Sequence, residues 1–299
     1  MKKYNISPEY GIFAKFTPPF HRALFPISSF VLGLIPKMLK SDAEVKIAKK
    51  RLKTAYGGHI GLYIFYPVRT TTDKVLLYIH GGGFAFKGSS CHYHLCRRFA
   101  AESNCKVVYV DYRLSPQYKY PVPLNDCFRA YQWIVKNAAR LKIDTSKIIV
   151  GGDSAGGCLA VDVTLKALQK NLVKPCYQML IYPLLDKRRH TQSMKVYTDT
   201  PMWNSRLTKR MWRYYLGEHP YISPNERADL SNMPPTYLET AEYDCLHDEG
   251  IDFARKLMEH GVPVTLYETK QTMHGYDIKN CPTTEKAQKR RIKVLHDIQ

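Results

Sequence analysis

Acidic residues are scarce in this sequence. Its 299 residues contain 26 Asp and Glu against 45 Lys and Arg, which gives a formal net charge of +19. The basic residues are scattered, and their densest runs, at 46–53 and 286–293, are short. Because a nucleic-acid-binding protein gathers such charge on one face, we expect solvated surfaces and no nucleic-acid partner.

Long apolar runs are also missing. The stretch from Phe25 to Ile35 is apolar, but it contains Pro26, two serines and Gly33 and is too short to span a bilayer. The opening Met1-Lys2-Lys3 resembles the start of a signal peptide, yet no apolar core or cleavage site follows it. We therefore expect a cytoplasmic protein that makes no membrane contact.

The cysteines follow no pattern typical of a metal site or of a disulfide framework. All eight are irregularly spaced, which favours a reducing compartment. Cys91 and Cys96 enclose His92 and His94, but this segment falls where a helix is expected, and its side chains fit a packing role. We expect neither a metal nor a cofactor.

A strand, a sharp turn and a helix are predicted around Ser154. The run Lys147-Ile148-Ile149-Val150 is apolar and β-branched, and Gly152-Asp153-Ser154-Ala155-Gly156-Gly157 follows it, ahead of small and apolar residues. This is the context of a nucleophile elbow, in which flanking glycines let the helix pack close to the strand and leave the serine Oγ exposed. Ser154 is therefore the candidate nucleophile.

A second motif follows an earlier strand. The segment from Lys74 to Ile79 predicts a buried strand and ends in His80-Gly81-Gly82-Gly83-Phe84, a motif type that supplies half of an oxyanion hole. We expect the oxyanion to be bound by the N–H of Ala155 and by those of two among Gly81, Gly82 and Gly83. Gly-x-Ser-x-Gly alone arises by chance in roughly one chain in ten, but the two motifs in this order are specific.

Predicted strands alternate with helical segments over most of the chain. This pattern indicates an α/β fold with a mostly parallel sheet that is covered by helices on both faces. A Gly57-Gly58-His59 turn between the alternating segments 51–56 and 62–66 predicts an antiparallel hairpin at the start of the sheet. The buried strands are expected at 75–79, 106–110, 148–150, 179–182, 237–240 and 264–267.

With these motifs the chain resembles the hormone-sensitive lipase-like family of α/β hydrolases, which are mostly bacterial esterases. The resemblance runs from about residue 50 to about residue 278 and includes Asp111 to Pro116 and Asp244 to Gly250. It implies the α/β-hydrolase fold with a helical cap. Two positions depart from the family pattern, since Gln117 stands where an acid is usual and Cys245 where proline is usual.

Acyl transfer by a serine needs a histidine base and an acid that orients it, and in α/β hydrolases the chain order is serine, acid, histidine. Asp244 follows a predicted strand and is the candidate acid, with Glu242 and Asp248 as alternatives. His274 is the one histidine on a loop just beyond the next predicted strand, so it is the candidate base.

The resemblance implies a catalytic core of residues 46–186 and 233–299, with a cap of residues 1–45 and 187–232 over the site. Alternatively, the first segment supports the domain and never meets substrate. About 45 residues separate Asp186 from the next strand, which is more than a crossover needs. We expect substrate contacts from Phe84, Tyr112, Trp203 and Tyr276.

These observations favour a serine carboxylesterase that acts on short to medium acyl esters. The expected partner is a small-molecule ester, and the protein is expected to be a monomer or a homodimer. Alternatives are a membrane-surface lipase, an amidase or peptidase, and a non-catalytic receptor of the same fold. Plant gibberellin receptors resemble this family but lack the histidine base, so His274 argues against the receptor.

Overall fold

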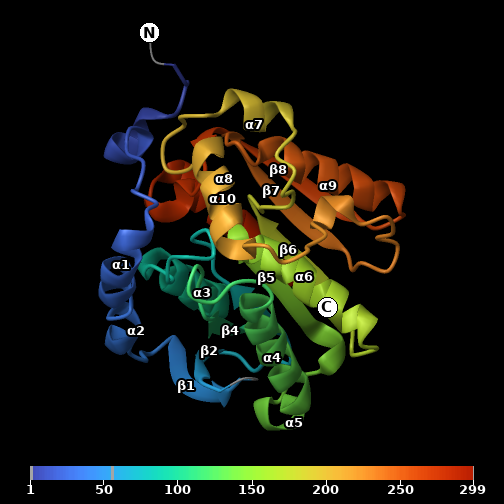
Figure 1. Ribbon diagram of the computed structural model, residues 1–299. Helices are drawn as coiled ribbons and strands as arrows, with labels where there is room; N and C mark the ends of the chain where they lie inside the picture. Colours follow the sequence, from blue (N-terminus) through green and yellow to red (C-terminus); the bar gives the residue numbers. More distant parts are fainter. Residues whose placement is uncertain (1–2, 55–56, 299) are drawn as a thin grey trace.

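The computed structural model describes residues 3–54 and 57–298. Met1 and Lys2, and Ala55 and Tyr56 of the expected hairpin, lie outside the described residues. The fold is that of an α/β hydrolase, as predicted, with helices packed around one central sheet (Figure 1).

The sheet has eight strands in the order β1-β2-β4-β3-β5-β6-β7-β8. Only β2 runs against the others, since β1–β2 and β2–β4 pair antiparallel and all remaining pairs are parallel. The expected hairpin is β1–β2. The strands are β1 (Val45–Lys53), β2 (His59–Pro67), β3 (Val75–Ile79), β4 (Lys106–Asp111), β5 (Ile148–Asp153), β6 (Tyr177–Ile181), β7 (Thr236–Tyr243) and β8 (Val264–Met273).

Helices cover both faces of the sheet. The helices are α1 (Phe25–Leu32), α2 (Ile35–Met38), α3 (Ser90–Glu102), α4 (Val122–Lys136), α5 (Ala138–Leu141), α6 (Ala155–Gln169), α7 (Gln192–Val196), α8 (Ser205–Leu216), α9 (His247–Glu259) and α10 (Pro282–Asp297). Short 3-10 helices lie at Pro8–Ala14, Arg22–Leu24, Thr145–Lys147, Pro224–Glu226 and Tyr276–Ile278. Figure 1 shows the N-terminal segment, in blue, running along one side of the molecule through α1 and α2.

Alternation along β3 divides the core into two layers. Leu77 and Ile79 face a layer that includes residues of α4, α6 and α9, whereas Leu76 and Tyr78 face a layer that includes residues of α3 and α10. Successive side chains of a strand point to opposite faces, so the continuous apolar run of β3 serves both layers.

The strand β8 is longer than its sequence suggests. It continues from the predicted residues 264–267 to Met273 at the edge of the sheet; residues 265–267 are exposed, contrary to the expected buried strand, and exposed and buried residues mix along 268–273. An edge strand needs no alternation of buried residues on both faces, so the apolar pattern did not reveal this extension. As a result His274 follows the last residue of β8 directly.

Two segments outside the sheet pack on each other. The Phe20 ring lies 5.1 Å from the Trp203 ring, between centroids, and an Arg210 N–H donates to the Phe20 carbonyl at 2.8 Å. The N–H of Met202 donates to the Phe16 carbonyl at 2.7 Å. Residues before β1 are therefore joined to residues between β6 and β7, next to the carboxyl ends of the strands.

Candidate active site

Ser154 occupies a tight turn between β5 and α6. Its φ of 54° lies in the left-handed region, and its ψ is −122°. The turn is fixed on both sides, because the Ser154 N–H donates to the Ile181 carbonyl at 2.9 Å and the Ser154 carbonyl accepts from the Leu184 N–H at 3.0 Å. A Cβ at Gly156 would collide with the Ile79 carbonyl oxygen, so this glycine is required for α6 to approach β3.

The three residues named as nucleophile, base and acid meet at the carboxyl ends of the strands. Ser154 Oγ lies 2.8 Å from His274 Nε2, and His274 Nδ1 lies 2.6 Å from Asp244 Oδ2. All three side chains are nearly buried, and Asp244 is completely so. This order of contacts is the one that a serine nucleophile, a histidine base and an orienting acid require.

Asp244 is fixed in place by its own loop, whereas the two alternative acids are engaged elsewhere. Asp244 Oδ1 accepts a hydrogen bond from the Leu246 N–H at 2.9 Å. Glu242 accepts from the Gln271 N–H at 2.7 Å. Asp248 accepts from the Ser193 N–H at 2.7 Å and lies in the first turn of α9, after the N-cap residue, which is Leu246.

Gly82 and Gly83 of the oxyanion loop line the same pocket as Ser154. The Gly81 N–H is already used, since it donates to Asp153 Oδ1 at 3.0 Å. Within residues 3–54 and 57–298, the N–H groups of Gly82, Gly83 and Ala155 find no acceptor. They are the available donors for a developing oxyanion.

Asp153 connects the oxyanion loop to α3, and sequence reasoning missed this role. Its carboxylate accepts from the Tyr78 hydroxyl at 2.8 Å and lies 3.2 Å from His92 Nε2. His92 Nδ1 in turn accepts from the Ser89 N–H at 3.0 Å, so Nε2 carries the proton. Burial alone raises the pKa of Asp153, but His92 and the Tyr78 hydroxyl lower it to about 2, which keeps the carboxylate charged.

A pocket of about 540 Å³ opens over Ser154 and His274, within the size range of small-molecule sites. Its walls are mostly apolar, and part of them comes from the N-terminal segment between Pro18 and Leu32. Trp203, one of the expected substrate contacts, lies on it, with its ring centroid 6.1 Å from that of His274. The apolar lining includes Leu24, Ile27, Val31, Leu32, Phe86, Met202 and Ile278.

The structure does not bring the other three expected substrate contacts to this pocket. Phe84 has a φ of 58°, and its ring turns inward and stacks on Tyr215. The Tyr112 hydroxyl donates to the His80 carbonyl at 2.9 Å, and the Tyr276 hydroxyl donates to the buried Glu239. Position next to a motif suggested substrate contact, but packing and hydrogen bonding direct these side chains into the interior.

His80 supports the oxyanion loop as a neutral, buried ring. It stacks on Tyr112 with the two centroids 4.4 Å apart, and its Nδ1 lies 2.8 Å from the Gly81 carbonyl oxygen. Burial lowers its pKa to about 3. A neutral imidazole with Nδ1–H donating to that carbonyl fits this position.

A buried ion pair stands behind the His274 loop. Arg291 of α10 and Glu239 of β7 are both fully buried, with 2.6 Å between Nη2 and Oε1. Arg291 also contacts Asp277 at 2.7 Å, and the Tyr182 hydroxyl donates to the same Asp277. The Tyr182 ring lies 5.0 Å from that of His274, so the network packs against the candidate base.

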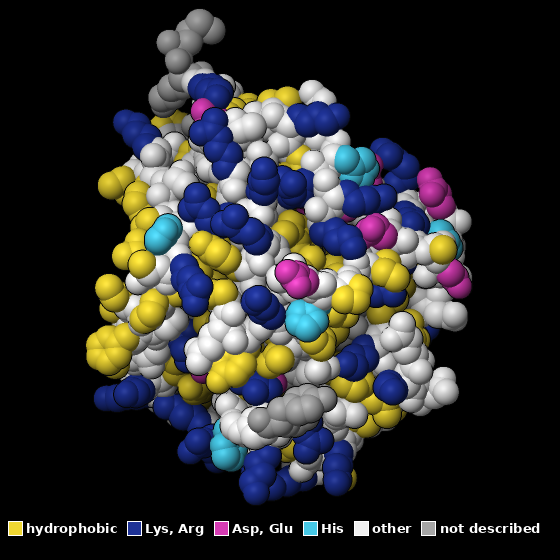
Figure 2. All heavy atoms as spheres, viewed as in Figure 1, with side chains coloured by type: hydrophobic (Ala, Val, Ile, Leu, Met, Phe, Trp, Pro, Cys, Tyr) yellow, Lys and Arg dark blue, Asp and Glu magenta, His cyan; other side chains and the backbone are white. Residues whose placement is uncertain are grey.

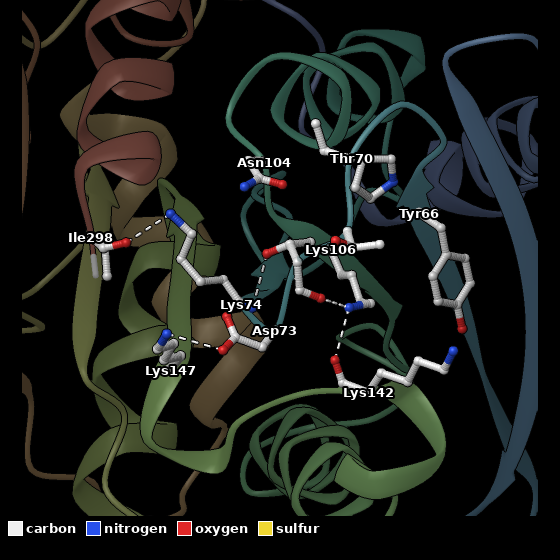
Figure 3. A pocket seen from close by; sticks show the side chains of 12 residues that line it. Tyr66, Thr70, Asp73, Lys74, Asn104, Lys106, Lys142, Lys147 and Ile298 are labelled. Atoms are coloured by element: carbon white, nitrogen blue, oxygen red, sulfur yellow. Dashed lines mark hydrogen bonds and ion pairs between the residues drawn. The ribbon is translucent and has the colours of Figure 1, made fainter.

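A larger hollow of about 810 Å³ lies at the opposite ends of the strands (Figure 3). Lys74 directly precedes β3 and Lys106 begins β4, so both lie at the amino ends of these strands, whereas Ser154 lies at the carboxyl end of the parallel strand β5. Their ammonium groups are already used, since Lys74 Nζ donates to three carbonyls at the end of α10 and Lys106 Nζ donates to those of Thr72 and Lys142. We therefore assign the chemistry to the pocket at Ser154.

Among residues 3–54 and 57–298, no three His, Cys, Asp or Glu side chains come together as metal ligands. The described residues also include no helix with the length and apolar character to cross a bilayer.

Comparisons with known proteins identify the family of the chain. Residues 76–278 match a family described by the alpha/beta hydrolase fold. Esterase LipI of Mycobacterium tuberculosis is 30% identical over 282 residues, which cover 85% of this chain and 88% of the relative. The ethyl acetate hydrolase of Pseudomonas putida is 30% identical over 246 residues, covering 79% of this chain and 77% of the relative.

Among solved structures, a bacterial heroin esterase superposes with a TM-score of 0.88 at 33% sequence identity. The match covers 99% of this chain and 98% of the other.

Proposed function

The chain belongs to the hormone-sensitive lipase-like family of α/β hydrolases and is a carboxylic ester hydrolase, and from that premise we propose that Ser154 is its nucleophile and that its substrates are short to medium acyl esters. The observation that carries the proposal is the continuous series of contacts from Ser154 Oγ through His274 to Asp244. A receptor of this fold would have no need of that series.

In the acylation half, His274 Nε2 removes the Ser154 proton while Oγ bonds to the ester carbonyl carbon. The carbonyl π electrons move to oxygen, and the oxyanion accepts hydrogen bonds from the N–H groups of Gly82, Gly83 and Ala155. Asp244 holds the Nδ1–H tautomer and stabilises the imidazolium. When the oxyanion collapses, the bond to the alcohol oxygen breaks, and His274 gives its proton to that oxygen.

In the deacylation half, water takes the place of the alcohol. His274 removes a proton from the water, the resulting hydroxide oxygen bonds to the acyl carbon, and the second oxyanion uses the same donors. Collapse releases the carboxylic acid and returns the proton to Ser154 Oγ. Every atom is supplied by the ester, water and the three side chains, so no cofactor takes part.

The acyl preference rests on the pocket and on a relative. An apolar pocket of about 540 Å³ suits a compact acyl group, and one relative is named for ethyl acetate hydrolysis. Residues 1–45 and 187–232 act together as the cap in this proposal, supported by the Phe20–Trp203 contact and by the pocket walls that both segments provide.

Active-site labelling tests the assignment of the nucleophile. We expect a fluorophosphonate probe to add one covalent group to the protein and mass spectrometry to find it on Ser154. His274→Ala, which removes the base, should slow labelling strongly. A stoichiometric adduct on another residue in the wild-type protein would refute Ser154 as the nucleophile.

A further inference from the structure

The helices α1 and α2 present apolar side chains to solvent. Ile27 is 64% exposed, Phe30 70%, Val31 55% and Met38 75%. No described part of the chain covers these side chains. Soluble proteins expose single apolar residues commonly, but a group of large ones on consecutive turns marks a surface that another body covers.

This apolar face, defined by Ile27, Phe30, Val31, Leu34 and Met38, continues into the pocket. Ile27 and Val31 line the same pocket as Ser154 and Trp203, whereas Phe30 and Met38 are exposed and do not line it. In Figure 2 apolar side chains gather along the edge that α1 and α2 occupy in Figure 1, with basic side chains beside them. A body seated on this face would therefore adjoin the mouth of the pocket.

The segment that carries the apolar face has positive charge only. From Tyr10 to Ser41 the sequence has no Asp or Glu, although the whole chain has 26. The same segment has four basic residues, all exposed, and none of them takes part in an ion pair among residues 3–54 and 57–298. These residues are Lys15, Arg22, Lys37 and Lys40.

Apolar side chains and unpaired cations together fit a lipid surface with negative headgroups. The apolar groups can enter the boundary between headgroups and acyl chains, and the cations remain at the level of the phosphates. A second copy of this chain fits less well, because a two-fold contact would bring the same four cations against their counterparts. The short helix α1 suits a position along the surface, since it is too short to enter deeply.

We propose that the α1–α2 face binds anionic phospholipid bilayers, with the mouth of the pocket turned toward the lipid. The sequence predicted no membrane contact and kept a membrane-surface lipase, with the stretch from Phe25 to Ile35 on the lipid, as an alternative; the exposure of these side chains favours that alternative for binding. The sequence alone could not decide between a covered cap and an exposed lipid-binding face, because the residue types are apolar in both cases. The proposal concerns binding and does not depend on which residue carries the chemistry.

Vesicle flotation with the full-length protein tests the proposal. We expect the wild type to float with vesicles of phosphatidylcholine and phosphatidylglycerol, and at least tenfold less with phosphatidylcholine alone at low salt. The double variant Phe30→Glu/Met38→Glu should lower the partition coefficient for the mixed vesicles at least tenfold. Neither residue lines the pocket, so hydrolysis of a soluble ester should be unchanged in this variant.

Met258→Glu is the matched control. Met258 is 50% exposed on α9, outside the α1–α2 face. The Met258→Glu variant should therefore bind vesicles as the wild type does. Absence of wild-type flotation would overturn the proposal, as would equal losses in the double variant and the control. A dimer that the double variant dissociates, without vesicle binding by the wild type, would assign the face to a second copy and likewise overturn it.

Discussion

Asp153 and Gly81 are joined by a hydrogen bond of 3.0 Å from the Gly81 N–H to the carboxylate. The residue that precedes the proposed nucleophile thereby holds the loop that provides the proposed oxyanion donors. Since the same carboxylate binds Tyr78 and His92, the position of Gly82 and Gly83 relative to Ser154 depends on one buried charged group.

Asp153→Ala should therefore lower kcat by about 10- to 100-fold with little change in KM. The proposed oxyanion donors lose their alignment, whereas the apolar walls of the pocket stay in place. Steady-state kinetics on a soluble ester measures both constants. Tyr78→Phe is the matched control, since it removes one hydrogen bond to the same carboxylate and leaves the Gly81 contact. Equal losses of kcat in the two variants would show that the Gly81 bond has no separate role.

Gly83→Ala should abolish most activity. A Cβ at this position would lie 2.8 Å from Trp203 Cη2 and 3.1 Å from Phe20, so either the loop or the aromatic wall must move. Gly261→Ala is the control, because Gly261 has a similar left-handed φ of 75° but open space around it. Both variants should lose roughly 1–2 kcal/mol of stability through backbone strain, and only Gly83→Ala should lose activity.

Asp162 should make stability depend on pH. It is buried on α6, and burial raises its pKa to about 7, although the Tyr221 hydroxyl, Arg227 and Lys166 oppose the rise. The unfolded carboxyl ionises near 3.8, so the folded protein binds the extra proton between these values. Stability from this group is thus present below about pH 4 and is lost as the pH rises to about 7.

Asp162→Asn should remove this dependence. As the pH rises from about 5 to about 8, the free energy of unfolding of the wild type should fall by about 3 kcal/mol more than that of the variant. Urea denaturation at the two pH values measures this difference. Asp252→Asn, at a half-exposed carboxyl on α9, should show no such difference from the wild type, and a difference no larger in Asp162→Asn than in this control would contradict the assignment.

The buried Arg291–Glu239 pair gives a stability test. Arg291→Met removes the close partner of the buried Glu239 carboxylate and leaves it only the longer contact of 3.5 Å with Arg290, so it should cost about 3–5 kcal/mol. The double variant Arg291→Met/Glu239→Leu should recover part of that loss. Arg255→Met, which breaks the exposed Arg255–Asp252 pair, should cost about 0–1 kcal/mol. Thermal or urea unfolding compares them, and equal losses for Arg291→Met and Arg255→Met would be inconsistent with a structural role for the buried pair.

The fold could be predicted because its central strands are continuous apolar runs between helices. The nucleophile motif and the three candidate residues could be recognised in the sequence because each of them follows a predicted strand. The role of Asp153 could not be predicted, because nothing in its residue type reveals that Gly81 and His92 converge on it. The inward turn of Phe84 depends on a left-handed φ, which sequence does not specify for a phenylalanine.

The proposed cap, residues 1–45 and 187–232, was the least predictable part. Trp203 was expected to contact substrate, but which side chains of the two segments line the pocket depends on how the segments pack. Trp203 lines the pocket, packs on Phe20 and lies next to Gly83 of the oxyanion loop. The buried pair of Arg291 and Glu239 joins elements more than 50 residues apart, and no local pattern links them.

Initial rates on p-nitrophenyl esters from acetate to palmitate, with wild type and Ser154→Ala side by side, test the central claim most directly. We expect activity that is highest on short to medium chains and is lost in the variant, whose fold should be unchanged by circular dichroism. Equal activity in Ser154→Ala, or a folded wild type that hydrolyses none of these esters, would contradict the assignment of Ser154 as an esterase nucleophile.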